Sequence, residues 1–306
     1  MECKSAISLI RPINSVMVGI GILVGEVIAY AGIPPLKHII LGFLVGFLAS
    51  SGIMALNDYF DIEIDKINAP RRPIPCGKIS PKKALALGVS LVLLAILLAF
   101  LESFLAGIFA SITLLLDVLY DASLKRTGFI GNLIVSYSVA APFIYGALAL
   151  SRPIDSLIIA ISLMAFLSNL GREVIKGIID VEGDRAAGVK TVAVVLGIRA
   201  AQAIGATFVI LAVIVSLILP LYQAVNALYY LVIPTTDVIL LYSAYLSLKT
   251  TDKETLRKAK DLMRLGMLIA LIIFIAMSLI PTETYTRKDL REKLTYFLRS
   301  SGIFSK

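Results

Sequence analysis

Residues 37–65 read KHIILGFLVGFLASSGIMALNDYFDIEID, an apolar run with one lysine at its start and a cluster of acidic residues at its end. A helix needs about 20 consecutive, mostly apolar residues to cross the hydrocarbon core of a bilayer. The run 37–56 has that length, and the first acid, Asp58, follows almost directly. This stretch therefore predicts a membrane-spanning helix whose end presents carboxylates at one membrane face.

The composition of the whole chain agrees with a membrane protein. Of its 306 residues, 58% are hydrophobic and 16% are charged, and the mean hydropathy is +0.91. A soluble domain usually carries roughly 25% charged residues, because it must cover its surface with them. The composition therefore excludes a soluble cytosolic enzyme and a disordered chain.

The net charge of +8 does not indicate a nucleic-acid partner. The basic residues stand between long apolar runs, where they act as topology signals and as contacts for anionic ligands. Two cysteines and one histidine are too few for a disulfide framework or a multi-histidine metal site. We expect membrane lipid and small anionic substrates as partners.

Further apolar runs of similar length follow along the chain. We expect an all-α membrane protein with nine transmembrane helices in a domain of residues 1–282, followed by a basic C-terminal tail, 283–306. The nine predicted spans are residues 13–32, 37–56, 84–101, 103–119, 129–149, 154–173, 201–220, 227–248 and 264–280.

The acidic cluster at the end of the second span has the spacing of one helix face. Asp58, Asp61 and Asp65 are three and four residues apart, and Asn57 precedes Asp61 by four. Carboxylates at this spacing repel one another, and a bound cation would remove the repulsion. Because the ligands are carboxylates with an amide oxygen, we expect a hard ion, most simply Mg²⁺.

A second acidic cluster ends the sixth span. Lys176, Asp180 and Asp184 follow one another at steps of four, and Asp180 lies 122 residues beyond Asp58 (58 to 180). Each cluster ends an even-numbered span on the same membrane side and is followed by a basic loop. We therefore expect an internal pseudo-repeat of about four helices, whose two sites face each other over a central cavity.

Two carboxylate sets that hold Mg²⁺ among basic side chains suit a diphosphate. The metal ions neutralise the diphosphate, and the cations stabilise its charge as it departs. The apolar bundle offers room for a long hydrocarbon chain, so the pattern favours an enzyme that ionises a prenyl diphosphate at the membrane face. Acidic helix ends that merely pair with nearby lysines and arginines account less well for two matched clusters.

Basic residues gather in alternate loops between the predicted spans. If the N-terminus is cytoplasmic, the opposite loops carry only Lys37 and Arg152. By the positive-inside rule, we expect a multi-pass protein of the cell membrane with its active site on the cytoplasmic side. The basic tail conflicts with nine spans, which place it outside; either the count is off by one or the tail lies along the interface.

These residues resemble the signatures of the UbiA superfamily of intramembrane prenyltransferases. The resemblance runs from Arg11 to about residue 280, and it implies a nine-helix bundle around a lipid-facing cavity with Mg²⁺ between two motifs. The family motifs N-D-x-x-D-x-x-x-D and D-x-x-x-D match Asn57, Asp58, Asp61 and Asp65, and Asp180 and Asp184.

The resemblance also suggests roles for single residues. We expect the four acids Asp61, Asp65, Asp180 and Asp184 to be catalytic Mg²⁺ ligands, with Asn57 and Asp58 as further ligands. Some basic residues are candidates for the diphosphate oxygens, and others lie where a second anionic headgroup could bind. The former are Arg72, Lys78, Lys125 and Lys176; the latter group is Arg11, Asn14 and Arg172.

Finer features look like one branch of this family, which acts in archaeal lipid synthesis. They include Arg71-Arg72-Pro73-Ile74-Pro75 and Gly171-Arg172-Glu173 beside the two motifs. The likeness implies transfer of a geranylgeranyl group from geranylgeranyl diphosphate to the free hydroxyl of geranylgeranylglyceryl phosphate, which forms the second ether bond of archaeal membrane lipids. One departure is Gly177, where relatives often have an acid; the second metal then binds more weakly or relies on Glu173 or Glu182.

Two rival functions are open on the sequence. One is a prenyltransferase that acts on an aromatic acid or quinone precursor, and the other is a cation-coupled transporter. Cations beyond the needs of the diphosphate favour a phosphorylated acceptor over a neutral phenol. Transport sites usually lie near the bilayer midplane, whereas these acids lie at one face.

Some residues inside the spans have no assigned role. Glu26, Asp117 and Asp237 are costly in hydrocarbon, so we expect each to face the interior of the bundle. Aromatic rings near the site could stabilise an allylic cation, although packing is the simpler explanation for each. These rings are Tyr59, Tyr120, Tyr137, Phe143 and Tyr145.

Overall fold

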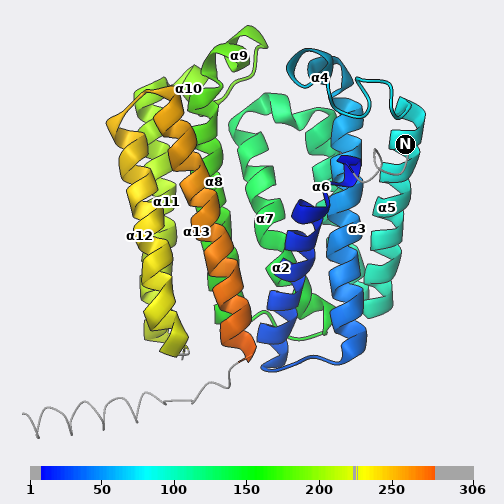
Figure 1. Cartoon of the computed structure of the whole chain (residues 1–306). Coiled ribbons are helices and arrows are strands. Elements are labelled where there is room, and N and C mark those ends of the chain that lie inside the picture. Colours follow the sequence, from blue (N-terminus) through cyan, green and yellow to red (C-terminus); the bar gives the residue numbers. More distant parts are fainter. Residues whose placement is uncertain (1–7, 223–224, 226, 280–306) are drawn as a thin grey trace, which may run out of the picture.

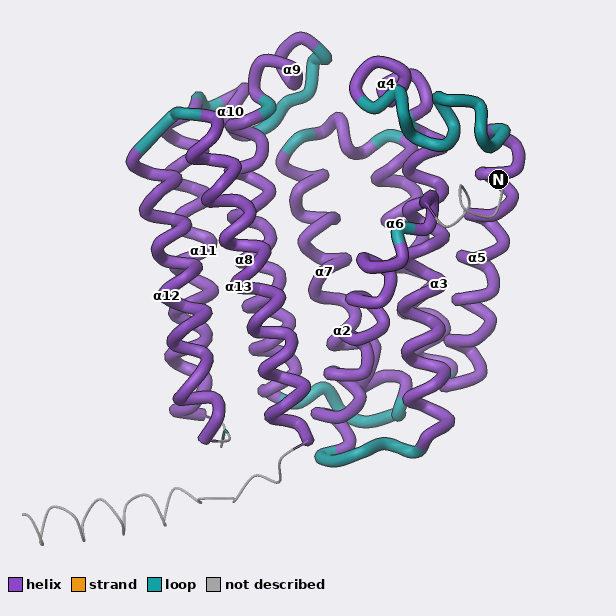
Figure 2. Tube along the Cα trace, in the orientation of Figure 1, coloured by secondary structure: helices purple, strands orange, loops and turns teal. Residues whose placement is uncertain are grey.

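The computed structural model describes residues 8–222, 225 and 227–279, and every regular element among them is a helix. Figures 1 and 2 show long helices that run side by side through the molecule, with short helices and loops at one end. The predicted all-α fold is confirmed.

Eight of the described helices are long and apolar enough to cross a membrane. They correspond to the first eight predicted spans, and the largest difference is at the end of the sixth, predicted at residue 173 and found at Ile179. They are α2 (Pro12–Tyr30), α3 (Leu36–Phe60), α5 (Pro81–Glu102), α6 (Phe104–Ala122), α7 (Phe129–Ala149), α8 (Ser156–Ile179), α11 (Ile198–Tyr222) and α12 (Ala227–Lys249).

The ninth predicted span, 264–280, falls mostly within α13 (Lys253–Leu279), and the count of nine is not confirmed. This helix begins well before residue 264, and the added part is rich in charged residues. Helix α13 is not among the eight spans found within the described residues. The predicted tail, 283–306, lies outside the described residues.

The long helices surround a central cavity of about 660 Å³. Helices α2, α3, α5, α6 and α7 form one group and α8, α11, α12 and α13 form the other, and contacts of α7 with α8 and of α2 with α13 join them. All of these helices except α5 line the cavity, mostly with apolar side chains. The predicted central cavity is confirmed, and its volume lies in the range of small-molecule pockets, about 300–1,000 Å³.

Glycines let α2 and α3 approach closely beside this cavity. A Cβ atom at Gly46 would lie 2.8 Å from Cα of Gly19 and 3.0 Å from Cδ1 of Ile22. Small residues at such contacts allow the van der Waals packing that holds membrane helices together, since lipid supplies no hydrophobic driving force between them. The spacing of Gly42 and Gly46 in the quoted stretch is therefore a packing feature.

The two acidic clusters lie at the same end of the bundle. Each continues from a long helix into a short one: α3 leads into α4 (Ile62–Asn68), and α8 leads into α9 (Val181–Ala186). Figure 1 places α4 and α9 at this end, on either side of the middle of the molecule. Two other short helices connect long ones: η1 (Leu124–Thr127) joins α6 to α7, and α10 (Val192–Val195) precedes α11.

The breaks within these helix pairs define the register of the pseudo-repeat. Helix α3 ends before Asp61 and α8 ends before Asp180, so these residues correspond, as do Asp65 and Asp184. Each pair is 119 residues apart (61 to 180 and 65 to 184), whereas the first acids of the two clusters, Asp58 and Asp180, are 122 residues apart. The ends of the two long helices therefore set the register of the repeat.

Candidate active site

The first acidic motif lies at a bend between α3 and α4. Asp61 stands between the two helices with φ −94° and ψ 9°, yet the backbone hydrogen bonds continue through it. The N–H of Asp61 donates to the carbonyl of Asn57 at 2.9 Å, and the N–H of Asp65 donates to the carbonyl of Asp61 at 2.7 Å. The motif therefore keeps helical spacing across the bend, as its three-and-four pattern predicted.

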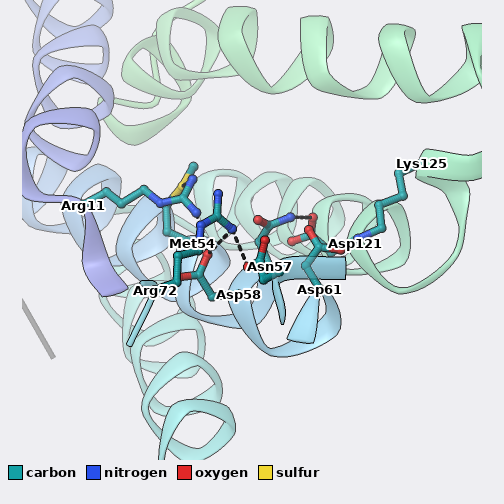
Figure 3. Close-up of polar contacts among 9 residues, drawn as sticks. Arg11, Met54, Asn57, Asp58, Asp61, Arg72, Asp121 and Lys125 are labelled. Carbon is teal, nitrogen blue, oxygen red and sulfur yellow. Dashed lines mark hydrogen bonds and ion pairs between the residues drawn. The ribbon is translucent and has the colours of Figure 1, made fainter. Parts of the chain in front are cut away.

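Two arginines bind the buried acids of this motif, and Figure 3 shows those that bind Asp58. Asp58 accepts hydrogen bonds from Arg11 at 2.5 Å and from Arg72 at 3.2 Å, and Arg72 also donates to Asp65 at 2.6 Å. The Asp58 and Asp65 side chains are 4% and 7% exposed. Because an unpaired buried carboxylate is costly, the arginines stabilise the folded arrangement of both acids.

A third ion pair ties the motif to the end of α6. Lys125, in η1, pairs with Asp61, and Asn57 donates to Oδ1 of Asp121 at 2.7 Å (Figure 3). The first motif thus holds three carboxylates against three basic side chains. Two of the predicted diphosphate contacts, Arg72 and Lys125, are bound to predicted metal ligands.

Arg11 reaches Asp58 from a strained backbone. It precedes Pro12 at the start of α2 with φ 44° and ψ 68°, in the left-handed region that bulky residues rarely adopt. Such a conformation costs about 1–3 kcal/mol and persists only where surrounding contacts determine it. Here those contacts are the ion pair with Asp58 and a 3.3 Å hydrogen bond to Sδ of Met54.

The second motif repeats the bend at the end of α8. Asp180 has φ −95° and ψ 4°, and its N–H donates to the carbonyl of Lys176 at 3.2 Å. Asp180 is exposed and Asp184 is half-buried. Burial raises the pKa of the Asp184 carboxyl, the nearby Asp180 carboxylate raises it further, and the Lys176 ammonium opposes this shift. Asp180 and Asp184 thus lie at one helix junction without the bound arginine that the first motif has in Arg72.

Glu173 and Glu182, the two acids considered as substitutes for an acid at position 177, have different surroundings. Glu173 is buried, lines the cavity, and pairs with Arg172 at 2.6 Å and with Lys176 at 3.2 Å. Glu182 is exposed and pairs with Lys253 at 2.7 Å, outside the cavity lining. The hydrogen bond from Lys253 lowers the pKa of Glu182. Of the two, Glu173 alone faces the cavity.

Part of the predicted site lines the central cavity or a second pocket at the acidic end of the molecule. A second pocket of about 580 Å³ lies beside the first motif and is lined by Arg11, Asp58, Arg71 and Arg72 among others. Arg11 therefore borders both pockets. The predicted residues that line the central cavity are Arg11, Asn14, Asn57 and Arg172.

The remaining predicted residues lie outside the lining of both pockets. Lys78 is exposed and forms no ion pair with a described residue, so the structure gives no support for its predicted diphosphate contact. The others lie on the two helix junctions or in η1, where the ion pairs and bends above hold them. They are Asp61, Asp65, Lys125, Lys176, Asp180 and Asp184.

The donor set of the two motifs fits Mg²⁺, which prefers carboxylate and amide oxygens. Within the described ranges, however, no three acids, histidines or cysteines are grouped closely enough to hold a metal ion. The ion pairs give the reason: Asp58, Asp61 and Asp65 each bind a basic side chain instead of converging on one point. The residues therefore fit a metal ion that arrives with an anion able to bind the released cations.

Helix α6 adds acids that the two motifs did not identify. Asp117, Tyr120 and Asp121 all line the cavity, and Oδ2 of Asp121 is buried without a hydrogen-bond partner. Tyr120 lies within electrostatic range of both Asp61 and Glu173. The four-residue spacing of Asp117 and Asp121 on an apolar helix is the signal that could have identified this face.

The three acids inside the spans face the interior, as predicted. Asp117 accepts a hydrogen bond from Ser138, and Asp237 accepts one from Ser216 at 2.7 Å; both acids line the cavity. Glu26 is fully buried outside the cavity lining, and neither of its carboxylate oxygens has a hydrogen-bond partner. Asp117 and Asp237 are therefore positioned to meet a ligand, and Glu26 is not.

Comparison with known proteins relates this arrangement to one family. Residues 18–281 match the UbiA prenyltransferase family. The chain is 41% identical over 280 residues to a digeranylgeranylglyceryl phosphate synthase of Thermococcus kodakarensis. The aligned residues cover 92% of this chain and 100% of that protein. The chain is 37% identical to a synthase of the same name from Methanosphaera stadtmanae, over 88% of this chain and 97% of that protein.

Solved structures show the same fold. A structure of digeranylgeranylglyceryl phosphate synthase matches with a TM-score of 0.78 at 31% identity, over 91% of this chain and 99% of that one. A UbiA homologue from Archaeoglobus fulgidus, bound to DMAPP and Mg²⁺, matches with a TM-score of 0.62 over 89% of this chain and 99% of that one. Its identity is 17%, so that second likeness concerns the fold alone.

Proposed function

The chain belongs to the UbiA prenyltransferase family, and from this premise we propose that it transfers a geranylgeranyl group from geranylgeranyl diphosphate to the free hydroxyl of geranylgeranylglyceryl phosphate. The reaction depends on Mg²⁺ and forms the second ether bond of archaeal membrane lipids. Identities of 41% and 37% to synthases that carry this name, over 92% and 88% of the chain, support the choice of substrates.

The observation that carries the proposal is the pair of acidic helix junctions at one end of an apolar cavity. Carboxylates and basic side chains at that end suit a metal-bound diphosphate, and the apolar lining suits a prenyl chain. A transporter would be expected to hold its ions near the bilayer midplane. The position of the motifs at the helix ends therefore favours group transfer.

The metal would be held by the oxygen donors of the two motifs. When bound, Mg²⁺ neutralises the diphosphate and makes it a better leaving group. Glu173 is a further donor from the second half, because it is the acid beside Lys176 that faces the cavity. The proposed ligands are Asn57, Asp58, Asp61, Asp65, Asp180 and Asp184.

The chain's own cations bind and orient the donor substrate. Arg72 and Lys125 lie against the acids of the first motif, from where they donate charge-assisted hydrogen bonds to diphosphate oxygens. Lys176 has the same position beside the second motif, since it pairs with Glu173 at 3.2 Å. The apolar cavity wall holds the prenyl chain and excludes water, so the allylic carbon meets the acceptor hydroxyl instead of water.

The acceptor hydroxyl must lose a proton as the ether bond forms. Asp121 is suited to accept it, because this residue lines the cavity and its Oδ2 atom is buried without a hydrogen-bond partner. A departing diphosphate oxygen is the other base that the reaction itself supplies. The proton therefore leaves toward the acidic end of the cavity.

The same argument extends to the place of the protein in the cell. We propose a multi-pass protein of the cell membrane, with residues 1–282 as its transmembrane domain and 283–306 as a basic tail. Lys37 and Arg152 are the basic residues of the loops at the far end, whereas the acidic end is rich in lysine and arginine. The positive-inside rule then places the acidic end, and the active site, on the cytoplasmic side.

Product mass spectrometry on the purified protein in lipid nanodiscs tests the proposal. The protein receives geranylgeranyl diphosphate and Mg²⁺ with one acceptor at a time, either geranylgeranylglyceryl phosphate or 4-hydroxybenzoate. We expect digeranylgeranylglyceryl phosphate with the first acceptor, and no product in excess chelator. Prenylation of the benzoate alone would favour an aromatic acceptor, and cation flux in liposomes without any transfer would favour a transporter.

A further inference from the structure

Arg264 lies on the wall of the central cavity and has no role in the site described so far. It belongs to α13, which packs against α2, α8 and α12. The other residues that α13 contributes to the cavity wall are glycine and apolar side chains, among them Met267 and Phe274. Arg264 is therefore the charged group that this helix presents to a bound lipid.

The guanidinium of Arg264 is unpaired. The other two arginines of the cavity wall each bind an acid: Arg11 binds Asp58 at 2.5 Å, and Arg172 binds Glu173 at 2.6 Å. Arg264 forms no hydrogen bond or ion pair with any residue in the described ranges. The acid that α12 contributes to the cavity wall, Asp237, is hydrogen-bonded to Ser216 at 2.7 Å.

A second unused donor lies on the same half of the bundle. Nε of Arg172 is buried and has no hydrogen-bond partner, although the Nη1 atom of this side chain binds Glu173. Arg172 is on α8, against which α13 packs. The wall formed by α8 and α13 thus carries unsatisfied guanidinium donors.

These donors lie apart from the first acidic motif. Helices α13 and α3 flank α2 on opposite sides, as Figures 1 and 2 both show. The basic residues beside the first motif, Arg72 and Lys125, are matched to its carboxylates. The arginines of α8 and α13 therefore exceed what the diphosphate end of the site uses.

Arg264 is exposed on the cavity wall and forms no ion pair with a described residue, so its donors are free to bind an anionic ligand in the cavity. Arginine presents a planar set of donors that matches a phosphate group in a bidentate geometry. We propose that Arg264, with Nε of Arg172, binds the phosphomonoester of the acceptor lipid and thereby selects a phosphorylated acceptor over a neutral one. This inference rests on the proposed function and adds the residue that reads the acceptor's headgroup.

Calorimetric titration of the purified protein in nanodiscs tests the assignment without turnover. Three ligands are compared: geranylgeranylglyceryl phosphate, its dephosphorylated alcohol, and geranylgeranyl diphosphate with Mg²⁺. We expect Arg264→Gln to weaken binding of the phosphorylated acceptor roughly ten- to hundred-fold, the size of a lost hydrogen bond to a charged group. Binding of the alcohol and of the diphosphate should stay within about two-fold of wild type, a change of about 0.4 kcal/mol.

Two variants separate this role from a structural one. Arg264→Lys keeps the charge and should recover part of the lost affinity. Arg257→Gln removes an exposed arginine on the same helix, outside the cavity wall, and should leave all three affinities unchanged. Equal weakening of all three ligands by Arg264→Gln, or no weakening at all, would overturn the proposal. Free glycerol phosphate and an anionic phospholipid serve as further titrants, and equal binding of either would assign the site to phosphate in general.

The wild-type titration distinguishes this test from that of the function. If wild-type protein does not bind geranylgeranylglyceryl phosphate but binds 4-hydroxybenzoate, the proposed function fails. If wild-type protein binds the phosphorylated acceptor and Arg264→Gln binds it equally well, the function stands and the assignment of Arg264 fails.

Discussion

Asp61 and Asp180 occupy equivalent positions in the two halves of the molecule, with φ and ψ of −94° and 9° in one and −95° and 4° in the other. Each closes a long helix, and each accepts a backbone hydrogen bond from an aspartate four residues later, Asp65 or Asp184, at 2.7 and 2.9 Å. The two sites are thus built on one backbone design. Their surroundings differ, because Asp61 and Asp65 form ion pairs, whereas Asp180 and Asp184 form none with a described residue.

Gly177 holds the position in the second half that Asp58 holds in the first, since each precedes the aspartate at the helix junction by three residues. We expect Gly177→Asp to lower the Mg²⁺ concentration needed for half-maximal activity, because it adds a carboxylate to the second motif. A Cβ atom there would lie 3.6 Å from Cβ of Thr191, an ordinary contact, so the side chain has room. Titration of activity with Mg²⁺ checks this, and Gly177→Asn, of the same size without the charge, is the control; equal curves for both variants would contradict it.

Neutralising either motif should stop the reaction. We expect Asp65→Asn and Asp184→Asn each to lower kcat/KM by at least about 100-fold, equal to about 2.7 kcal/mol of transition-state stabilisation. Glu63→Gln and Glu182→Gln are matched controls, because they change exposed acids of the same short helices. The steady-state assay is read together with thermal unfolding, and an active Asp184→Asn protein would rule out the second motif as a metal site.

Lys125 should act on the donor substrate. It lies in η1 and pairs with Asp61 at the end of α3, and removing a charge-assisted contact to diphosphate costs about 1.5–3 kcal/mol. We therefore expect Lys125→Gln to raise the KM for geranylgeranyl diphosphate roughly ten- to hundred-fold, with little change in the KM for the acceptor. The exposed neighbour Arg126 provides the control variant Arg126→Gln. A rise in the acceptor KM instead would reassign Lys125.

Metal and diphosphate should bind together. The carboxylates of Asp58, Asp61 and Asp65 already hold three basic side chains, so Mg²⁺ alone must displace cations that then lack a counter-ion. We expect Mg²⁺ alone to raise the melting temperature little, whereas Mg²⁺ with an unreactive prenyl diphosphate analogue should raise it clearly. An analogue concentration of 100 times its Kd adds about 2.7 kcal/mol to the free energy of unfolding. Differential scanning fluorimetry measures both, and equal shifts with and without the analogue would show that the metal binds independently.

The contact of α2 with α3 should limit stability. A side chain at Gly46 would press against Cα of Gly19, and overpacking of this kind typically costs about 1–3 kcal/mol. We expect Gly46→Val to lower the melting temperature by several degrees. Gly183→Ala, at a glycine whose Cβ would meet no atom within 4 Å, should leave it unchanged. Thermal unfolding in one detergent compares them, and an unchanged Gly46→Val protein would mean that the helices can move apart.

The long helices could be predicted because their signal is local. A run of about 20 apolar residues has to span the bilayer wherever it occurs, and the first eight predicted spans each coincide with a helix. The ninth illustrates the limit: the apolar run gave the position of α13, but the charged residues from Lys253 onward continue the same helix. Hydropathy marks the lipid-embedded part of a helix and not the whole of it.

The acidic motifs could be predicted for a similar reason. Steps of three and four residues place side chains on one helix face, so the grouping of Asp58, Asp61 and Asp65 is fixed by the chain itself. The register of the repeat was harder to predict from the sequence, because it depends on the residues at which α3 and α8 end and not on the order of the acids. The sequence by itself therefore determined the spans, the motifs and the chemistry of their donors.

The tertiary structure decided which side chains meet. Asn57 bonds Asp121 and Lys125 bonds Asp61, in each case across 64 residues of chain, while Lys78 has no such contact. From the sequence, Lys78 and Lys125 were equal candidates for contacts with the diphosphate, and no pattern indicated that Arg264 lines the cavity. Partners of this kind follow from the packing of helices distant in sequence, because a charged side chain binds whichever group the neighbouring helix brings within a few ångströms, and no local pattern encodes that distance.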